Sequence, residues 1–281
     1  MNVHHINCAT MCPASRRLVN GEGGLFERGR MICHCLIVET GDGLVLVDTG
    51  FGTGDCTDPK HLGKMIIELT GPRFDIEETA LRQIERLGYK QDDVRHIVPT
   101  HLDLDHAGGL PDFPKAKVHL YRPEHAAAMA RATLHERERY KPKHWAHEPS
   151  FVTYETGGER WFGFDCVREL DGLPPEILIV PVVGHTRGHA AIAVDTGKGW
   201  LLHAGDAYFF HGEMDAKNPR CTPALTVFQR VIAMDNDARM HNQARLRELA
   251  RDHGGEVTVF SAHDPVELER FQVDEAAPHA A

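Results

Sequence analysis

Four side chains of the types that bind metal ions lie within six residues of one another in the segment from Thr100 to Gly109. They are His101, Asp103, Asp105 and His106. Leucines alternate with the first three, so in an extended chain the polar groups project to one side and the leucines pack on the other. Two carboxylates buried beside two imidazoles are costly unless a cation neutralises them. The spacing therefore predicts a site for a divalent metal.

Three later segments have the same form, in which an apolar run delivers a His or Asp at its carboxyl end. These segments are 182–189, 201–206 and 259–264. An earlier run ends in the same way at Asp48. Because strand ends from several parts of a sheet meet at one rim, we expect these residues to converge on a single site.

Apolar runs along the chain predict the strands that must position these side chains. The runs cover residues 35–38, 44–47, 96–98, 177–183, 190–194, 200–202 and 257–260. Asp42-Gly43 between the first two is typical of a hairpin turn. A helix is predicted over 75–87, where Asp75 and Glu78 form a capping box, and further helices over 123–132 and in two segments across 223–252. This order, without strict strand–helix alternation, indicates an α+β fold of packed sheets with helices outside.

The stretch from His125 to Gly158 differs from the rest because it is polar, aromatic and rich in His, Arg and Glu. Two interpretations stay open. It is either a partly helical insertion that forms a lid, or an irregular surface excursion.

Composition limits the class of protein. The chain has 281 residues, of which 42% are hydrophobic, as in ordinary globular domains. Its net charge of −10, with no basic block, argues against nucleic-acid binding. No apolar run is long enough to span a membrane and no secretion signal is recognisable, so a cytoplasmic protein without membrane contact is expected. Seven cysteines at irregular spacings fit reduced thiols.

Taken in order, these motifs resemble the metallo-β-lactamase superfamily. The shared pattern consists of Asp48 after an early strand, the run from His101 to His106, the Gly-His-Thr-x-Gly-His run at 184–189, then Asp206 and His263. The resemblance spans roughly residues 33–264. It implies a four-layer αββα sandwich with the metal site at the edge of the two sheets. We expect residues 1–281 to form one such domain, with the lid or insertion at 125–158.

The resemblance also implies which residues bind metal. One of two divalent cations, expected to be zinc, would be held by His101, Asp103 and His185, the other by Asp105, His106 and His263, with Asp206 bridging. Asp48 would tie the ligand loops together and His189 would support an imidazole. His203 is expected only to pack. Asp103 stands where the family has a second His. This harder oxygen ligand favours iron or manganese at the first position or leaves that position partly empty; alternatively, Asp103 supports a ligand and a water completes the coordination.

Such a pair of ions implies hydrolysis of a small-molecule substrate. A water between them loses a proton near neutral pH and becomes the nucleophile. Asp105 is the expected catalytic proton carrier. Lactonase-like members resemble this chain most, and in them a Tyr polarises the lactone, a role for which Tyr208 is the candidate.

The predicted bond is therefore a lactone or carboxylic ester. Thioester hydrolysis, phosphodiester hydrolysis and sulfur oxygenation at a single iron remain alternatives, as does a non-catalytic metal-binding protein. A homodimer is compatible with the sequence.

Overall fold

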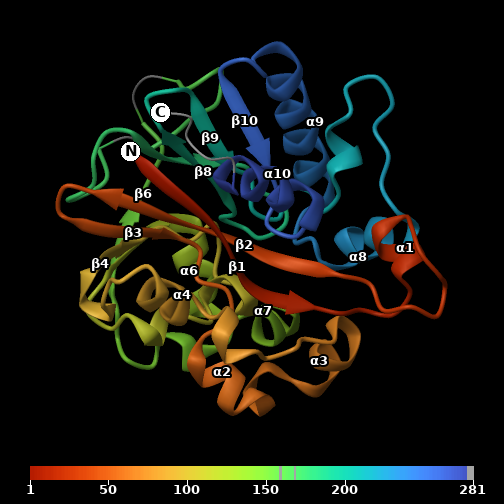
Figure 1. Cartoon of the computed structure of the whole chain (residues 1–281), viewed down its shortest axis with the longest axis horizontal. Coiled ribbons are helices and arrows are strands. Elements are labelled where there is room, and N and C mark those ends of the chain that lie inside the picture. The colour runs from red at the N-terminus through yellow and green to blue at the C-terminus, as the bar shows by residue number, and fades with distance from the viewer. Residues whose placement is uncertain (158–159, 168, 277–281) are drawn as a thin grey trace.

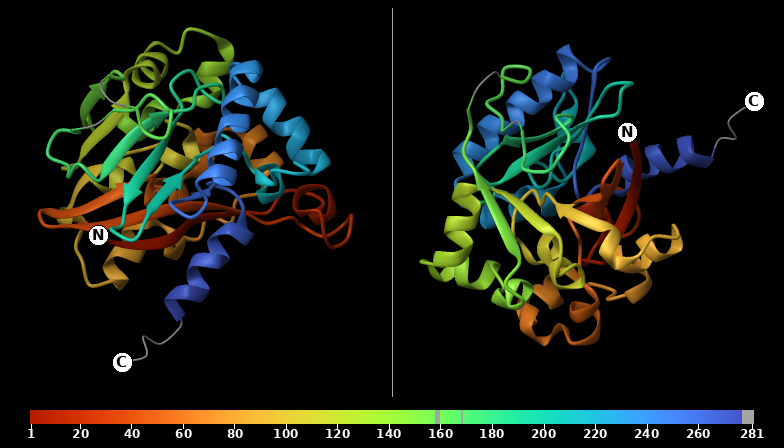
Figure 2. Two further views of the ribbon diagram at one scale, coloured as in Figure 1. Left: turned by 90° about the horizontal axis from the view of Figure 1, so that it is seen from above. Right: turned by 90° about the vertical axis from the view of Figure 1, so that its left-hand side faces the viewer.

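Two β-sheets pack face to face in the computed structural model, and helices cover the outer face of each sheet (Figures 1 and 2). The structure describes residues 1–157, 160–167 and 169–276. This arrangement confirms the predicted four-layer αββα sandwich.

The larger sheet has six strands in the order in which they occur in the chain. They are β1 (Asn2–Met11), β2 (Met31–Thr40), β3 (Gly43–Val47), β4 (Val94–Ile97), β5 (Lys117–Tyr121) and β6 (Ser150–Tyr154). The first three pair antiparallel and the last three join in parallel. Parallel pairing of β3 and β4 directs the chain after both strands, which carries Asp48 and His101, to the same rim of the sheet.

The smaller sheet has four strands in the order β10-β9-β8-β7. They are β7 (Ile177–Pro181), β8 (Ala190–Asp195), β9 (Trp200–His203) and β10 (Val257–Phe260). Strands β9 and β10 are parallel, so the loops that follow them, with Asp206 and His263, leave the sheet at one end.

Helices occupy the connections. The α-helices are α1 (Arg16–Asn20), α2 (Thr53–Thr57), α3 (Lys64–Thr70), α4 (Ala80–Arg86), α5 (Leu104–Ala107), α6 (Arg122–Ala130), α7 (Leu134–Arg139), α8 (Pro223–Ile232), α9 (Asn236–Asp252) and α10 (Pro265–Ala276). The short 3-10 helices are η1 (Pro59–Leu62), η2 (Ile76–Glu78), η3 (Gln91–Asp93), η4 (Leu110–Asp112), η5 (Pro142–Trp145) and η6 (His211–Met214).

Alternating side chains on each strand build separate layers of the core. On β2, Leu36 and Val38 pack between the sheets against residues such as Ile192, whereas Cys35 and Ile37 face the helices on the outside. Helices α4 and α6 contribute to this outer layer, and α9 covers the outer face of the smaller sheet. The strands that carry the metal-binding loops are therefore buried on both faces and hold those loops firmly.

Several local predictions need correction. The helix expected over 75–87 is broken: Asp75 caps the short helix η2, and Thr79 begins α4 with its own hydroxyl accepting from Arg82. Leu104 does not pack in an extended strand, because the chain turns into α5 there. Strands β1, β5 and β6 were not anticipated. Strand β6 lies inside the predicted insertion at 125–158, so the end of that segment belongs to the sheet; Gly158 lies outside the described residues.

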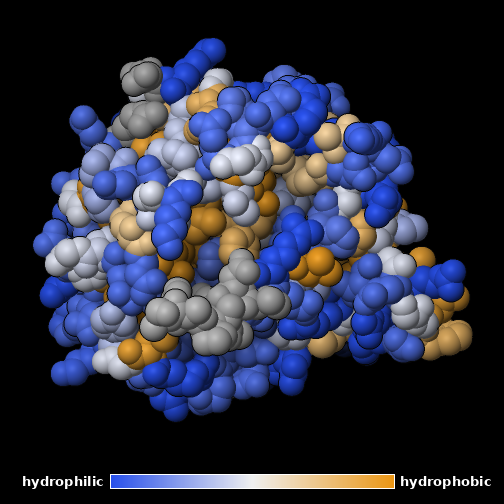
Figure 3. All heavy atoms as spheres, turned by 45° about the horizontal axis from the view of Figure 1, so that its top comes forward, coloured by the Kyte–Doolittle hydropathy of each residue, from blue (hydrophilic) through white to orange (hydrophobic). Residues whose placement is uncertain are grey.

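The surface is mostly hydrophilic, with small apolar areas between the polar residues on the face seen in Figure 3. Among the described residues, no helix has the length and apolar character needed to cross a membrane.

Candidate metal centre

The predicted ligands meet at the rim where the two sheets adjoin. The short loop after β4 carries His101 and leads into α5, for which Asp103 is the N-cap residue. His185 follows β7, Asp206 follows β9 and His263 follows β10. All seven predicted ligands therefore come together, from segments up to 162 residues apart.

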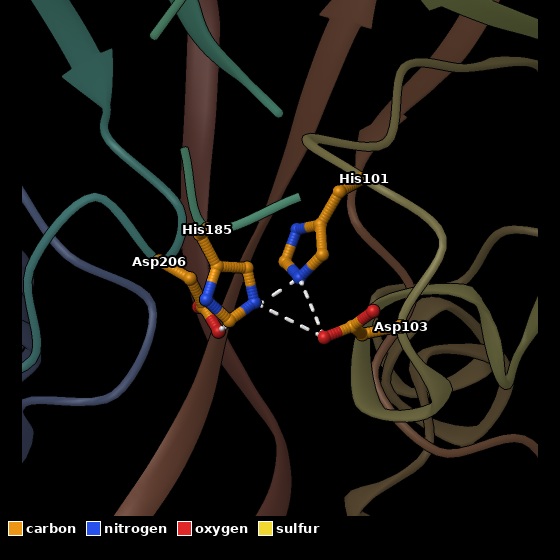
Figure 4. Close-up of side chains that lie close together, drawn as sticks. All are labelled: His101, Asp103, His185 and Asp206. Atoms are coloured by element: carbon orange, nitrogen blue, oxygen red, sulfur yellow. Dashed lines mark hydrogen bonds and ion pairs between the residues drawn. The ribbon is translucent and has the colours of Figure 1, made fainter. Parts of the chain in front are cut away.

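The first position is formed by two imidazoles and two carboxylates that are turned toward one another (Figure 4). The Nε2 atom of His185 lies 3.0 Å from Asp103 Oδ2 and 3.2 Å from Asp206 Oδ2. His101 Nε2 lies 3.4 Å from Asp103 Oδ2. Burial lowers the pKa of His185 to about 4, so its imidazole is neutral at neutral pH and can act as a ligand.

The second position shares Asp206 with the first. Asp206 Oδ1 lies 3.2 Å from His106 Nε2 and 3.0 Å from His263 Nε2, and Asp105 Oδ2 lies 3.6 Å from His263 Nε2. A buried thiol, Cys33, has its sulfur 4.0 Å from Asp105 Oδ2. Asp206 thus faces both positions with one oxygen each, as a bridging ligand does.

The donor atoms fit two divalent cations. Among the described residues, His101 Nε2, His106 Nε2 and Asp206 Oδ1 are buried and have no hydrogen-bond partner. Unpaired buried polar atoms are rare because each costs free energy. Burial would raise the pKa of Asp206, but nearby histidines hold it well below its usual range, so the carboxylate is charged. The site thus presents unpaired ligand atoms and negative charge to a cation.

Arg139, at the end of α7, is an unexpected part of the first position. Its Nη1 atom lies 2.7 Å from Asp103 Oδ2 and 3.1 Å from His185 Nε2, and its Nη2 donates to the carbonyl of Ile232. Although burial disfavours the charged carboxylate, Arg139 and His101 hold the pKa of Asp103 well below its usual range. The other oxygen, Oδ1, is buried without a hydrogen-bond partner and stays available to a metal.

A buried glutamate on α6, Glu124, fixes the loops of the first position. Its Oε1 accepts from the Leu102 backbone and the Tyr140 hydroxyl at 3.0 and 3.1 Å. Its Oε2 accepts from the Thr186 hydroxyl and the Gly188 backbone at 2.6 and 3.1 Å. One carboxylate therefore joins the two ligand loops to the helix α7 segment.

Asp48 lies where the resemblance implied, whereas His189 supports the loop of Asp206 and not an imidazole. Asp48 accepts from Thr100 N at 2.7 Å and lies 2.8 Å from His106 Nδ1, so it orients a ligand imidazole. His189 Nε2 accepts from the backbone N–H of Asp206 at 2.9 Å. His203, by contrast, contacts the carbonyl of His34 and packs in the core. Asp48 and His189 therefore support the predicted ligands and are not ligands themselves.

Tyr208 does not face the site. It is fully buried, and its hydroxyl lies 2.9 and 3.1 Å from the two carboxylate oxygens of Glu267 on α10. Glu267 also accepts from Ser261 N at 2.7 Å, which fixes the start of the loop that carries His263. This geometry does not support the expected catalytic role of Tyr208 and gives it a structural one.

A cavity of about 400 Å³ adjoins the ligands. Asp103, Asp105, Asp206 and His263 form one end. The remaining walls are mainly apolar and include Met11, Met31, Leu62, Met65, Ile66, Leu104, Phe209, Phe228 and Ile232. A cavity of this size and character accepts a small molecule with an apolar portion.

The sequence analysis missed Arg139, Glu124 and Cys33. The polar stretch at 125–158 was the only signal for Arg139, which lies within it together with the cavity residues His135 and Glu138. Glu124 sits one residue before that stretch and gave no signal, since a single Glu is ordinarily exposed.

Comparison with known proteins shows the family of the chain. The model of the metallo-beta-lactamase superfamily matches residues 28–263. A relative from Mycobacterium tuberculosis, named "Probable metallo-hydrolase Rv2300c", is 43% identical over 94% of this chain and 81% of its own. The N-acyl homoserine lactonase of Bacillus thuringiensis is 23% identical over 82% of this chain and 80% of its own.

Solved structures share the fold. An N-acyl homoserine lactone hydrolase with the product N-hexanoyl-L-homoserine bound at its catalytic metal centre superposes with a TM-score of 0.69 at 20% identity, covering 99% of this chain and 97% of that one. The dizinc quorum-quenching lactonase AidC gives a TM-score of 0.60 at 16% identity over 94% of this chain and 87% of its own. The chain is therefore a member of the metallo-beta-lactamase superfamily and a metallo-hydrolase.

Proposed function

We propose that this metallo-hydrolase opens lactones, or cleaves related carboxylic esters, that carry an apolar acyl group. The observation that carries the proposal is the cavity, whose apolar walls end at Asp105, Asp206 and His263. A polar reacting group would lie against these ligands, and the acyl chain would lie against side chains such as Phe228 and Ile66. Distant similarity to N-acyl homoserine lactonases supports the same substrate class.

We further propose two divalent cations at the site, with zinc at the position of His106, Asp206 and His263. When bound, such cations supply a water of lowered pKa and polarise the substrate carbonyl. The imidazoles and carboxylates of this chain would hold them, and Asp48 would keep His106 in its ligating orientation.

Asp105 is the residue placed to move a proton. Its side chain is partly exposed and lines the cavity, and its Oδ2 lies 3.6 Å from His263 Nε2. A carboxylate at the cavity end can accept a proton from the attacking water and return it to the leaving alkoxide. The apolar walls, including Leu104 and Phe209, would exclude other water from the reacting bond.

A chain-length series tests this proposal. Lactones with acyl chains of four to twelve carbons would be assayed for kcat/KM with the zinc-loaded enzyme. Each added methylene that is buried contributes about 0.8 kcal/mol, or about fourfold, so kcat/KM should rise with chain length until the cavity is filled. Turnover of thioesters or phosphodiesters, but of no lactone or ester at any chain length, would replace this proposal by those alternatives.

Cytoplasmic location, the homodimer and the lid at 125–158 stay predictions. For the lid, the contact between Arg139 and Asp103 supports a direct role of the segment at the site. Elemental analysis of the purified protein would give the metal identity at both positions.

A further inference from the structure

A second cluster of metal-binding side chains lies apart from the residues of the hydrolytic centre. Asp55 on α2, His61 on η1 and His144 on η5 bring their ligand atoms together. The Nε2 atoms of His61 and His144 lie 2.8 and 2.9 Å from the same oxygen, Asp55 Oδ1. Asp55 and His144 are almost fully buried, and 17% of the His61 side chain is exposed.

The hydrogen bond on the far side of the His61 ring indicates what its Nε2 can do. His61 Nδ1 lies 2.9 Å from the carbonyl oxygen of Asp58 and 3.3 Å from Lys143 Nζ; in the tautomer that donates to Asp58, Nδ1 carries the hydrogen. The Nε2 of a neutral ring then holds a lone pair that points at a carboxylate oxygen. The lone pair and the carboxylate oxygen repel each other. A cation between the two atoms would attract both.

The carboxylate is held in a matching way. Asp55 Oδ2 accepts from the backbone N–H of Gly52 at 3.0 Å, which fixes the group and leaves Oδ1 for the two imidazoles. Two His and one carboxylate form a ligand set that zinc takes, with water in the fourth place. Tetrahedral zinc ligands at bond lengths of about 2.0–2.2 Å lie roughly 3.3 Å apart, so zinc binding would widen the observed distances of 2.8 and 2.9 Å by about 0.4 Å.

We propose that Asp55, His61 and His144 bind a zinc ion that is separate from the hydrolytic centre. This ion would join two walls of the cavity. Leu62, next to His61, lines the cavity, and so does Arg139, five residues before His144. The zinc would link η1 to the segment that follows α7 and so hold Leu62 and Arg139 at a fixed separation.

The competing explanation is a proton instead of a metal. His61 would then be an imidazolium that donates to both Asp58 and Asp55, and His144 would donate its Nε2–H to Asp55. A neutral His61 that accepts from Lys143 Nζ at Nδ1 and donates from Nε2 to Asp55 would satisfy the same contacts without a metal. Metal stoichiometry separates the two explanations.

The experiment uses a protein whose hydrolytic centre has been disabled. Asp206→Ala with His185→Ala and His263→Ala leaves each hydrolytic position with two of its ligands, so after zinc loading and desalting this variant should retain one zinc per chain, at the proposed site. Adding His61→Ala should lower that to zero. The matched control is His253→Ala in the same background, because His253 pairs with Glu256 at 3.0 Å and no third ligand joins them among the residues that the structure describes; it should leave the one zinc in place.

Circular dichroism of each variant shows whether it is folded. Should the disabled background fail to fold, the same comparison is made in the otherwise unchanged protein, where His61→Ala should lose one equivalent of zinc and His253→Ala none. In that protein, X-ray absorption at the zinc edge should also show one fewer zinc–imidazole site in His61→Ala. Equal zinc content in the unchanged protein and in folded His61→Ala overturns the proposal.

Discussion

The two halves of the hydrolytic centre are built alike but carry charge differently. Each half has a buried glutamate behind its ligand loops: Glu124 behind the loops of His101 and His185, and Glu267 behind the loop of His263. In the second half, the carboxylates face only imidazoles and a thiol. In the first half, Asp103 faces Arg139, a cation that belongs to the chain itself.

This difference shows how a ligand can be exchanged without a change in total charge. Asp103 contributes −1 and Arg139 +1, so together they carry the same charge as one neutral imidazole. The two cations would therefore meet the same total protein charge as in a centre with His at position 103. What changes is the geometry, because Asp103 has one oxygen committed to Arg139 and one free.

The largest effect should follow removal of the group common to both halves. Asp206→Ala deletes the oxygens that face both positions, so metal and activity should be lost together. Loss of one preorganised electrostatic contact alone costs about 10²–10³-fold in rate, and this variant should lose at least that. Elemental analysis and kcat/KM on the best lactone measure it; retention of both would remove Asp206 from the centre.

Asp103→His should lower the stability of the protein, although it restores the usual ligand of the family at the first position. Arg139 would be left buried without its carboxylate, and loss of one partner of a buried ion pair costs about 3–5 kcal/mol. The double variant Asp103→His/Arg139→Met removes the stranded charge, so it should recover most of the free energy of unfolding and bind zinc more tightly at the first position.

Urea unfolding and zinc titration of both single variants and the double variant complete this cycle. The interaction is absent if the two single effects simply add. In that case Arg139 and Asp103 act independently, and the contrast between the halves disappears.

The second half should show a dependence of stability on pH. Burial raises the pKa of Glu267 to about 7, with the nearby Asp264 carboxylate adding to the shift. The folded state therefore binds a proton more tightly than the unfolded state, whose pKa is near 4.5. The stabilisation is complete below about pH 4.5 and is lost as the pH rises through about 7, amounting to about 3 kcal/mol at most.

Glu267→Gln mimics the protonated form and removes this titration. Its free energy of unfolding should fall less between pH 5 and 8 than that of the unchanged protein, both measured by urea unfolding at fixed zinc. Parallel pH profiles would mean that Glu267 does not titrate in this range.

Glu124→Gln should lower the metal affinity of the first position, with a smaller effect than the changes above. The amide nitrogen that replaces one oxygen would face N–H and O–H donors instead of accepting from them. Loss of such support behind a metal ligand costs about 10–100-fold in affinity. Zinc titration should show this loss at the first position only, and Tyr140→Phe, which removes one donor of the four, should lose less. Equal weakening at both positions would contradict the division into halves.

Tyr208→Phe should have the smallest effect. The hydroxyl contacts Glu267 and not the cavity, so catalytic efficiency should change by less than about threefold, while stability should fall by about 1 kcal/mol for the lost hydrogen bond. A loss of turnover rate by about two orders of magnitude, with KM unchanged, would restore the catalytic role first expected for this residue.

Many strands of the fold could be predicted from the sequence because they correspond to local patterns. Seven apolar runs became strands, since continuous apolar stretches between turns bury both faces. Strands β5 and β6 were missed because polar residues interrupt them: His119 is buried in β5 and hydrogen-bonds to Tyr154 of β6, so their polar groups are satisfied across the sheet. That pairing is not visible in either segment alone.

The candidate site likewise has residues that the sequence predicts and residues that it does not. The ligands stand in short motifs, so their approximate positions follow from order and spacing. Arg139 has no motif, since only the fold brings α7 to Asp103, 36 residues earlier. Tyr208 was placed by its distance from Asp206 in sequence, and one residue more or less in a turn after a strand decides which side chain enters the cavity.

His263 Nδ1 lies 2.7 Å from the carbonyl of Ile32, 231 residues away in the chain. During synthesis, His263, the last of the predicted ligands, leaves the ribosome only after strands β1 to β10 have been made, long after its partner Ile32 on β2. Pairings between such distant residues slow folding because a long loop has to close first. The hydrolytic centre is therefore among the last parts of this protein to form, and the nascent chain carries an incomplete set of ligands until β10 joins its sheet.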